Sequence, residues 1–131
     1  MADTKTGTHI TQVGVAMIPV SDQDRAIAFY TEKLGLELRG DTPFGDGNRW
    51  VEVAPAGGAT RISLVVPPDA QVGVEAGVAF STTDVDADHE ELRSRGVDVD
   101  DEVMRMGDPV PPMFWFRDQD GNRLLIVQDQ T

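Results

Sequence analysis

Apolar positions in the first third of the chain change their spacing in a way that predicts a strand followed by a helix. Residues 13–20 form a continuous apolar run rich in β-branched side chains. The run stops at Ser21 and Asp22, residue types that cap helix N-termini well. The segment that follows places apolar side chains at helical spacing, ending near Gly35 as a C-terminal stop: Ile27, Tyr30 and Leu34. We therefore predict a helix near residues 22–34.

The next thirty residues predict three strands joined by tight turns. Glycine, asparagine and aspartate mark the turns, and alternating apolar residues mark the strands. The expected order is a short strand at 36–38, a turn at 44–48, a strand at 49–54, a turn at 56–59 and a strand at 60–66. The first half of the chain is thus predicted to be a β-α-β-β-β unit.

The same pattern begins again after a proline-containing connector at residues 67–76. A strand at 77–84 leads into a helix near 84–95, and a hairpin of strands at 112–117 and 122–128 turns around Gln119, Asp120 and Gly121. Gly35 and Gly96, like Arg61 and Arg123, lie about 62 positions apart. We expect one domain over 1–131 with an N-terminal arm at 1–12 and repeats at about 13–66 and 77–128.

Composition and charge narrow the classes of partner. The chain has 131 residues, 40% of them hydrophobic, and a formal net charge of −12 from 23 acidic and 11 basic residues. A field of that sign repels nucleic acid and anionic lipid, so we expect neither partner. It can steer cationic ligands or simply keep the surface solvated. Cysteine is absent, no apolar run approaches the roughly 20 residues of a membrane span, and the polar N-terminus favours the cytoplasm.

Three segments resemble the vicinal oxygen chelate superfamily, which includes glyoxalase I, extradiol dioxygenases and bleomycin-resistance proteins. They are VSDQDRAIAFYTEKLGLEL (20–38), DVDADHEELRSRGVDV (84–99) and FRDQDGNRLLIVQ (116–128). The last is similar to an aromatic-x-Asp-Pro-Asp-Gly-Asn turn with Gln119 in place of proline. The resemblance implies an α+β fold, in which two βαβββ modules form an open curled sheet around a ligand cavity, often completed by a second subunit. We therefore expect a homodimer.

The metal enzymes of that superfamily place histidine or glutamate on four inner strand positions. Alignment to them puts Val15, Ser63, Val78 and Leu125 at or within one residue of these positions. Alkyl side chains cannot ligate a divalent cation, so we expect no metal and no cofactor. Elsewhere, His89 is expected to be a solvated helix residue, and the DQDGN segment (118–122) is expected to be a hairpin turn rather than a calcium loop.

Aromatic and thioether side chains mark the expected cavity instead. Alternate residues of a strand share a face, so Met113, Trp115 and Arg117 should point together, opposite Phe114 and Phe116. Burial of both tryptophans in the core is the competing interpretation. The predicted ligand-binding residues are Val15, Met17, Phe44, Trp50, Ser63, Val78, Met113, Trp115, Arg117 and Leu125.

These features favour a binding protein over an enzyme. The leading hypothesis is metal-independent binding and sequestration of a hydrophobic, aromatic natural product, as in antibiotic resistance. A divergent glyoxalase- or dioxygenase-like metal-dependent enzyme with unrecognised ligands is the alternative. A regulatory small-molecule role is a third hypothesis, and no catalytic residue is predicted.

Overall fold

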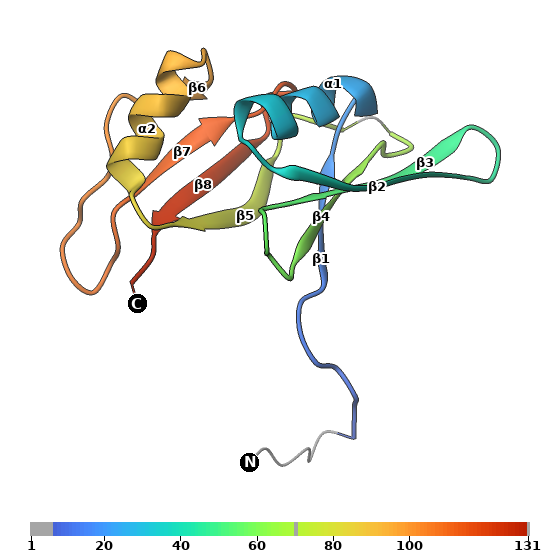
Figure 1. The fold of residues 1–131 in the computed structure, drawn as a ribbon, viewed down its shortest axis with the longest axis horizontal. Coiled ribbons are helices and arrows are strands. Elements are labelled where there is room, and N and C mark those ends of the chain that lie inside the picture. The colour runs from blue at the N-terminus through green and yellow to red at the C-terminus, as the bar shows by residue number, and fades with distance from the viewer. Residues whose placement is uncertain (1–6, 70, 131) are drawn as a thin grey trace.

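The computed structural model describes residues 7–69 and 71–130 and confirms two βαβββ modules (Figure 1). The first module contains β1 (Val15–Pro19), α1 (Gln23–Ala28), the π-helix η1 (Phe29–Lys33), β2 (Glu37–Phe44), β3 (Asn48–Ala54) and β4 (Arg61–Val65). The second contains β5 (Glu75–Thr82), α2 (Val85–Ser94), β6 (Asp98–Val99), β7 (Met113–Arg117) and β8 (Arg123–Gln128). No helix in the described ranges is long and apolar enough to cross a membrane.

Both helices begin at the aspartate that the sequence marks. Asp22 accepts a 3.1 Å hydrogen bond from the Arg25 amide, and Asp84 accepts one of 3.0 Å from the Ala87 amide. Each helical segment is followed by a glycine with positive φ, 78° at Gly35 and 83° at Gly96, where other residues would be strained. The two modules therefore share their helix-capping chemistry.

The first helix differs from the expected uninterrupted α-helix in its final turn. After Ala28 the chain widens into η1, and the Leu34 amide donates to the Phe29 carbonyl five residues earlier at 3.2 Å. In this conformation the Phe29 ring stacks against Phe116 of the second module, with centroids 6.5 Å apart. The helix of one module thus packs on a strand of the other.

Within the described residues the strands form two four-stranded mixed sheets. Sheet A has the order β1-β4-β3-β2 and sheet B the order β5-β8-β7-β6, with β1/β4 and β5/β8 parallel and the other pairs antiparallel. Strand β2 is longer than the expected 36–38 because it continues through Gly40 and Pro43 as the edge partner of β3. Edge strands tolerate proline and bulges, whereas in a local sequence pattern the same residues are typical of a loop.

One hydrophobic core is shared by the two modules. Buried residues of both sheets and both helices form a single cluster, including Ile18, Val51 and Leu64 from sheet A and Phe114 and Leu124 from sheet B. Figure 1 shows α1 and α2 along the upper side, with sheet B on the left and sheet A on the right. Each sheet therefore has one face toward the shared core and one face away from it.

The hairpin turn after β7 joins the two modules through buried polar groups. The Tyr30 hydroxyl donates to Asp118, and Asn122 donates from Nδ2 to the Pro19 carbonyl at 2.8 Å. Both Asp118 and Asn122 are buried. The side chain of Ser21 also reaches this turn, donating to Asp120 at 2.6 Å. The DQDGN segment is thus a structural connection, and the Asp118 carboxylate is already occupied by protein donors.

Candidate ligand-binding faces

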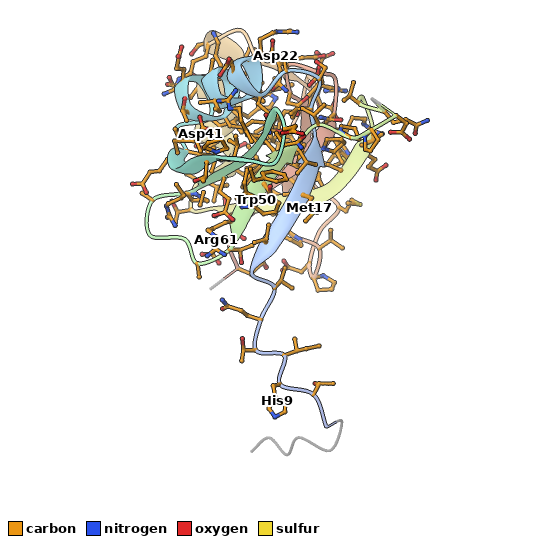
Figure 2. The ribbon with its side chains drawn as sticks, turned by 90° about the vertical axis from the view of Figure 1, so that its right-hand side faces the viewer. His9, Met17, Asp22, Asp41, Trp50 and Arg61 are labelled. Atoms are coloured by element: carbon orange, nitrogen blue, oxygen red, sulfur yellow. The ribbon has the colours of Figure 1, made fainter. Side chains whose placement is uncertain are left out.

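The outward side of sheet A carries aromatic, thioether and polar side chains in register. Met17 lies beside Ser63, Ser63 beside Glu52, and Trp50 beside Thr42. Because cross-strand partners share a face, strand alternation defines the set. We call it face A: Val15, Met17, Thr42, Phe44, Trp50, Glu52, Arg61 and Ser63. Figure 2 views this side of the molecule, with Met17, Trp50 and Arg61 in front of the sheet.

Glu52 connects the two largest side chains of face A. Its Oε2 accepts a 2.9 Å hydrogen bond from Trp50 Nε1, and its Oε1 lies 2.8 Å from Arg61 Nε. The Glu52 side chain is 15% exposed, whereas that of Arg61 is 41% exposed. The glutamate therefore holds the edge of the indole and the base of the guanidinium while both remain accessible from the open side.

Ser63 occupies the middle of face A without a polar partner. The residue is fully buried, and among the described residues nothing forms a hydrogen bond with its hydroxyl. Its neighbours in register are Met17, which is 59% exposed, and Glu52. An unpaired hydroxyl in a buried position costs about 1–3 kcal/mol, so it calls for an explanation.

The outward side of sheet B has a similar composition. We call it face B: Ala79, Met113, Trp115, Arg117, Arg123 and Leu125. Strand parity predicts the arrangement in β7 correctly, since Phe114 and Phe116 are buried in the core while Trp115 is half-buried on the open side. The Arg123 guanidinium lies over the Trp115 ring, 4.4 Å from its centroid, as a cation–π contact.

Charged partners hold the arginines of face B. Arg117 Nη2 donates to Asp100 at 2.7 Å, and Arg123 Nη1 lies 3.7 Å from Glu75. Asp100, in the group of aspartates after α2, thus supplies the ion partner of Arg117. Arg117 is a predicted site residue that the structure places on face B in a tight ion pair.

Two positions differ from the sequence interpretation. Val78 packs against the core rather than on face B, because the register of β5 against β8, with its irregularity between Glu75 and Ala79, leaves Ala79 opposite Leu125. His89 is half-buried instead of solvated, with Nε2 2.6 Å from the Asp100 carbonyl and its ring edge against Phe114. The acidic residues on either side of His89 indicated a solvent-exposed side chain. Because α2 packs on β7, the side chain is instead half-buried.

The central tier of each face shows what chemistry it can support. On face A the tier is Met17, Ser63 and Glu52, and on face B it is Ala79, Leu125 and Trp115. These side chains offer one hydroxyl and one carboxylate, and the carboxylate already contacts Trp50 and Arg61. Within the described ranges, no three histidine, cysteine, aspartate or glutamate side chains gather where they could hold a metal ion.

The predicted residues lie on two separate faces. Face A belongs to sheet A and face B to sheet B, and each lies on the side of its sheet away from the shared core. A hollow of about 310 Å³ lies elsewhere, between the modules near Leu36, Phe80 and Leu92, and none of the predicted ligand-binding residues lines it. A single chain thus carries the predicted residues on two separate faces.

Comparison with known proteins agrees with this architecture. The family profile of the Glyoxalase/Bleomycin resistance protein/Dioxygenase superfamily matches residues 9–126. The chain belongs to this superfamily. Among curated proteins, YetH of Bacillus subtilis (strain 168) is 34% identical over 128 residues, covering 91% of this chain and 99% of YetH.

Solved structures of the superfamily share the fold. TnmS3, described as an antibiotic binding protein from Streptomyces sp. CB03234, is 37% identical with a TM-score of 0.80, covering 94% of this chain and 99% of TnmS3. The fosfomycin resistance protein FosX from Listeria monocytogenes is 18% identical with a TM-score of 0.71, over 92% and 95% of the two chains. At that identity the likeness to FosX shows the fold alone.

Three polar residues of this superfamily member were not predicted as site residues. Glu52 and Arg61 lie on face A and Arg123 on face B. The sequence did contain signals for them, because Glu52 follows Trp50 by two positions in a strand and the two arginines repeat at the module offset. Their contacts with each other and with tryptophan required the sheet register.

Proposed function

We propose that this protein binds and sequesters a hydrophobic, aromatic small molecule of the antibiotic class, and that it does so without a metal ion. The observation that carries the proposal is the composition of the two outward faces. Each presents one partly exposed tryptophan beside a central tier that offers no set of metal-ligating side chains. The description of TnmS3, similar over nearly its whole length, as an antibiotic binding protein supports this choice.

Exposed apolar side chains on face A fit a planar, apolar ligand. Met17 is 59% exposed, Phe44 53% and Trp50 37%. Isolated exposed residues are common on protein surfaces, but here they gather on one side of one sheet. Stacking of a flat ligand on an indole ring contributes about 0.5–1.5 kcal/mol beyond burial of its area. Sequestration needs no further chemistry.

Two copies of the chain complete the site in this proposal. One copy contributes face A and the other contributes face B, and the two-fold symmetry of a dimer produces two equivalent pockets. Each pocket then holds Trp50 of one copy and Trp115 of the other. The separation of the two faces within one chain supports this arrangement.

Tryptophan fluorescence tests the binding proposal because the chain has two tryptophans, Trp50 and Trp115. We expect aromatic antibiotics from a natural-product panel to quench the emission saturably, with equal affinity before and after treatment with a chelator. Turnover that requires an added divalent cation, or one retained equivalent of metal per chain, would instead favour the metal-dependent enzyme. Absence of saturable binding across the panel would count against sequestration.

A further inference from the structure

We propose that Arg61 and Ser63 form the polar recognition element of face A, and that the ligand presents hydrogen-bond acceptor oxygens to them. The chemical class is an aromatic carboxylate or carbonyl compound rather than an aromatic cation. This inference rests on the proposed binding function and names the polar edge of its ligand.

Within the part of the chain that the structure describes, the hydroxyl of Ser63 has no hydrogen-bond partner. A fully buried hydroxyl without a partner in the described residues lowers stability, and alanine at this position would remove that cost. Such groups are expected where a ligand supplies the missing partner. Met17, its neighbour in register, is exposed and unbranched, so its thioether can move aside to admit a ligand atom.

Arg61, on the same face as that hydroxyl, has N–H donors without hydrogen-bond partners in the described ranges. Arg61 Nε lies 2.8 Å from Glu52 Oε1 without forming a hydrogen bond, and among the described residues no hydrogen bond involves either of its Nη groups. A guanidinium presents these N–H groups in a plane suited to carboxylate or carbonyl oxygens. Both Glu52 oxygens, by contrast, already have partners. The polar part of face A is therefore rich in donors.

An arginine at the start of a strand is repeated on face B. Arg123 occupies the position in β8 that Arg61 occupies in β4, each being the first residue of its strand. Their side chains are 45% and 41% exposed, and Arg123 already lies over an indole ring. The net charge of −12 would favour a cationic ligand at long range, but near each tryptophan an arginine is paired with a glutamate, so that these two charges balance locally.

Three probes with one ring system and different polar edges test the inference: anthracene carboxylate, anthracene carboxamide and anthracenylmethylammonium. Affinities are measured by fluorescence titration of the full chain. We expect the carboxylate and the carboxamide to bind at least about tenfold more tightly than the ammonium compound. Arg61→Gln should weaken carboxylate binding about tenfold without weakening the ammonium compound. Arg105→Gln is the matched control, since Arg105 pairs with Asp86 and lies outside both faces.

Ser63→Ala separates recognition from structure. We expect weaker binding of the carboxylate and the carboxamide, with an unchanged or higher melting temperature, because the hydroxyl has no partner to lose. Unchanged affinity in this variant, or equal binding of all three probes, overturns the inference while leaving recognition of the aromatic ring intact. If none of the three probes binds, both the inference and the proposed binding of aromatic ligands are overturned.

Discussion

The hydroxyl of Tyr30 donates a 2.6 Å hydrogen bond to Oδ2 of Asp118, linking η1 of the first module to the turn that follows β7 of the second. Tyr30 is fully buried. Burial, followed by the nearby charge of Asp118, raises the pKa of the Tyr30 phenol far above its ordinary value. Oδ1 of the same carboxylate accepts from the amides of Asp120 and Asn122. The contact thus couples the docking of the modules to a buried charge.

Stability should fall at high pH because of this phenol. The folded chain keeps Tyr30 protonated, whereas the unfolded chain releases that proton near pH 10. The unfolded state then binds fewer protons, so the free energy of unfolding decreases as pH rises above about 10. Tyr30→Phe should lower the free energy of unfolding by about 1–3 kcal/mol at neutral pH. The difference between this variant and the unaltered chain should shrink above about pH 10. Thermal unfolding at a series of pH values measures both effects.

Tyr30 is the single tyrosine, which makes the prediction directly observable. Tyrosinate absorbance should rise only as the chain unfolds. A titration of the folded protein with a midpoint near pH 10 would contradict the burial and hydrogen bonding of this side chain.

Asn122→Ala should be strongly destabilising. The Oδ1 atom accepts from the Gly73 and Val74 amides, and Nδ2 donates to the Pro19 carbonyl and to Asp118. Removal of a fully buried amide leaves these groups unpaired, so we expect a loss of at least about 2 kcal/mol in the free energy of unfolding. Denaturant unfolding measures it. Asn48→Ala, at an exposed position at the start of β3, is the control and should change stability little.

Trp115→Ala and Phe116→Ala should affect different properties, because the two side chains point to opposite sides of β7. Truncation of a tryptophan at a binding hot spot costs 2 kcal/mol or more, so Trp115→Ala should weaken an aromatic ligand by roughly thirtyfold. Phe116→Ala should instead destabilise the fold by about 3–5 kcal/mol. Melting temperature and affinity are compared for each variant. Loss of stability without loss of affinity in Trp115→Ala would refute the ligand-binding role.

The chain should sediment as a homodimer of about twice 14.2 kDa. Exposed apolar side chains on face A and half-buried ones on face B favour association of two copies. Phe44, 53% exposed at the end of β2, lies on the same side of the hairpin as Trp50. Phe44→Glu should shift the equilibrium toward monomer. Sedimentation of the unaltered chain as a monomer at tens of micromolar would contradict the dimer.

Much of the architecture could be predicted because its signals are local. Aspartate caps, glycine stops and the alternation in β7 depend on neighbours along the chain, and the structure confirms each. The repeat about 62 residues apart was equally visible. Strand parity also assigned Trp115 to the side opposite Phe114 and Phe116. Its function there remains a prediction.

Other features depended on contacts between distant segments. The length of β2 required its pairing with β3, and the place of Ala79 rather than Val78 opposite Leu125 required the register of β5 against β8. His89 became half-buried because α2 packs on β7. Local patterns carry no information about the bulges, edges and packing partners that decide these positions.

Local patterns predicted the order of most elements, their capping and the side of each strand on which its apolar residues lie, because helical and strand periods are set by backbone geometry. That both sheets share one core, with Trp50 in sheet A and Trp115 in sheet B, became visible only from contacts between the modules. The tertiary structure likewise revealed the unpaired Ser63 hydroxyl beside Glu52 and Arg61. Burial and hydrogen bonding depend on which strands pair and in which register, and those pairings join residues far apart in the chain.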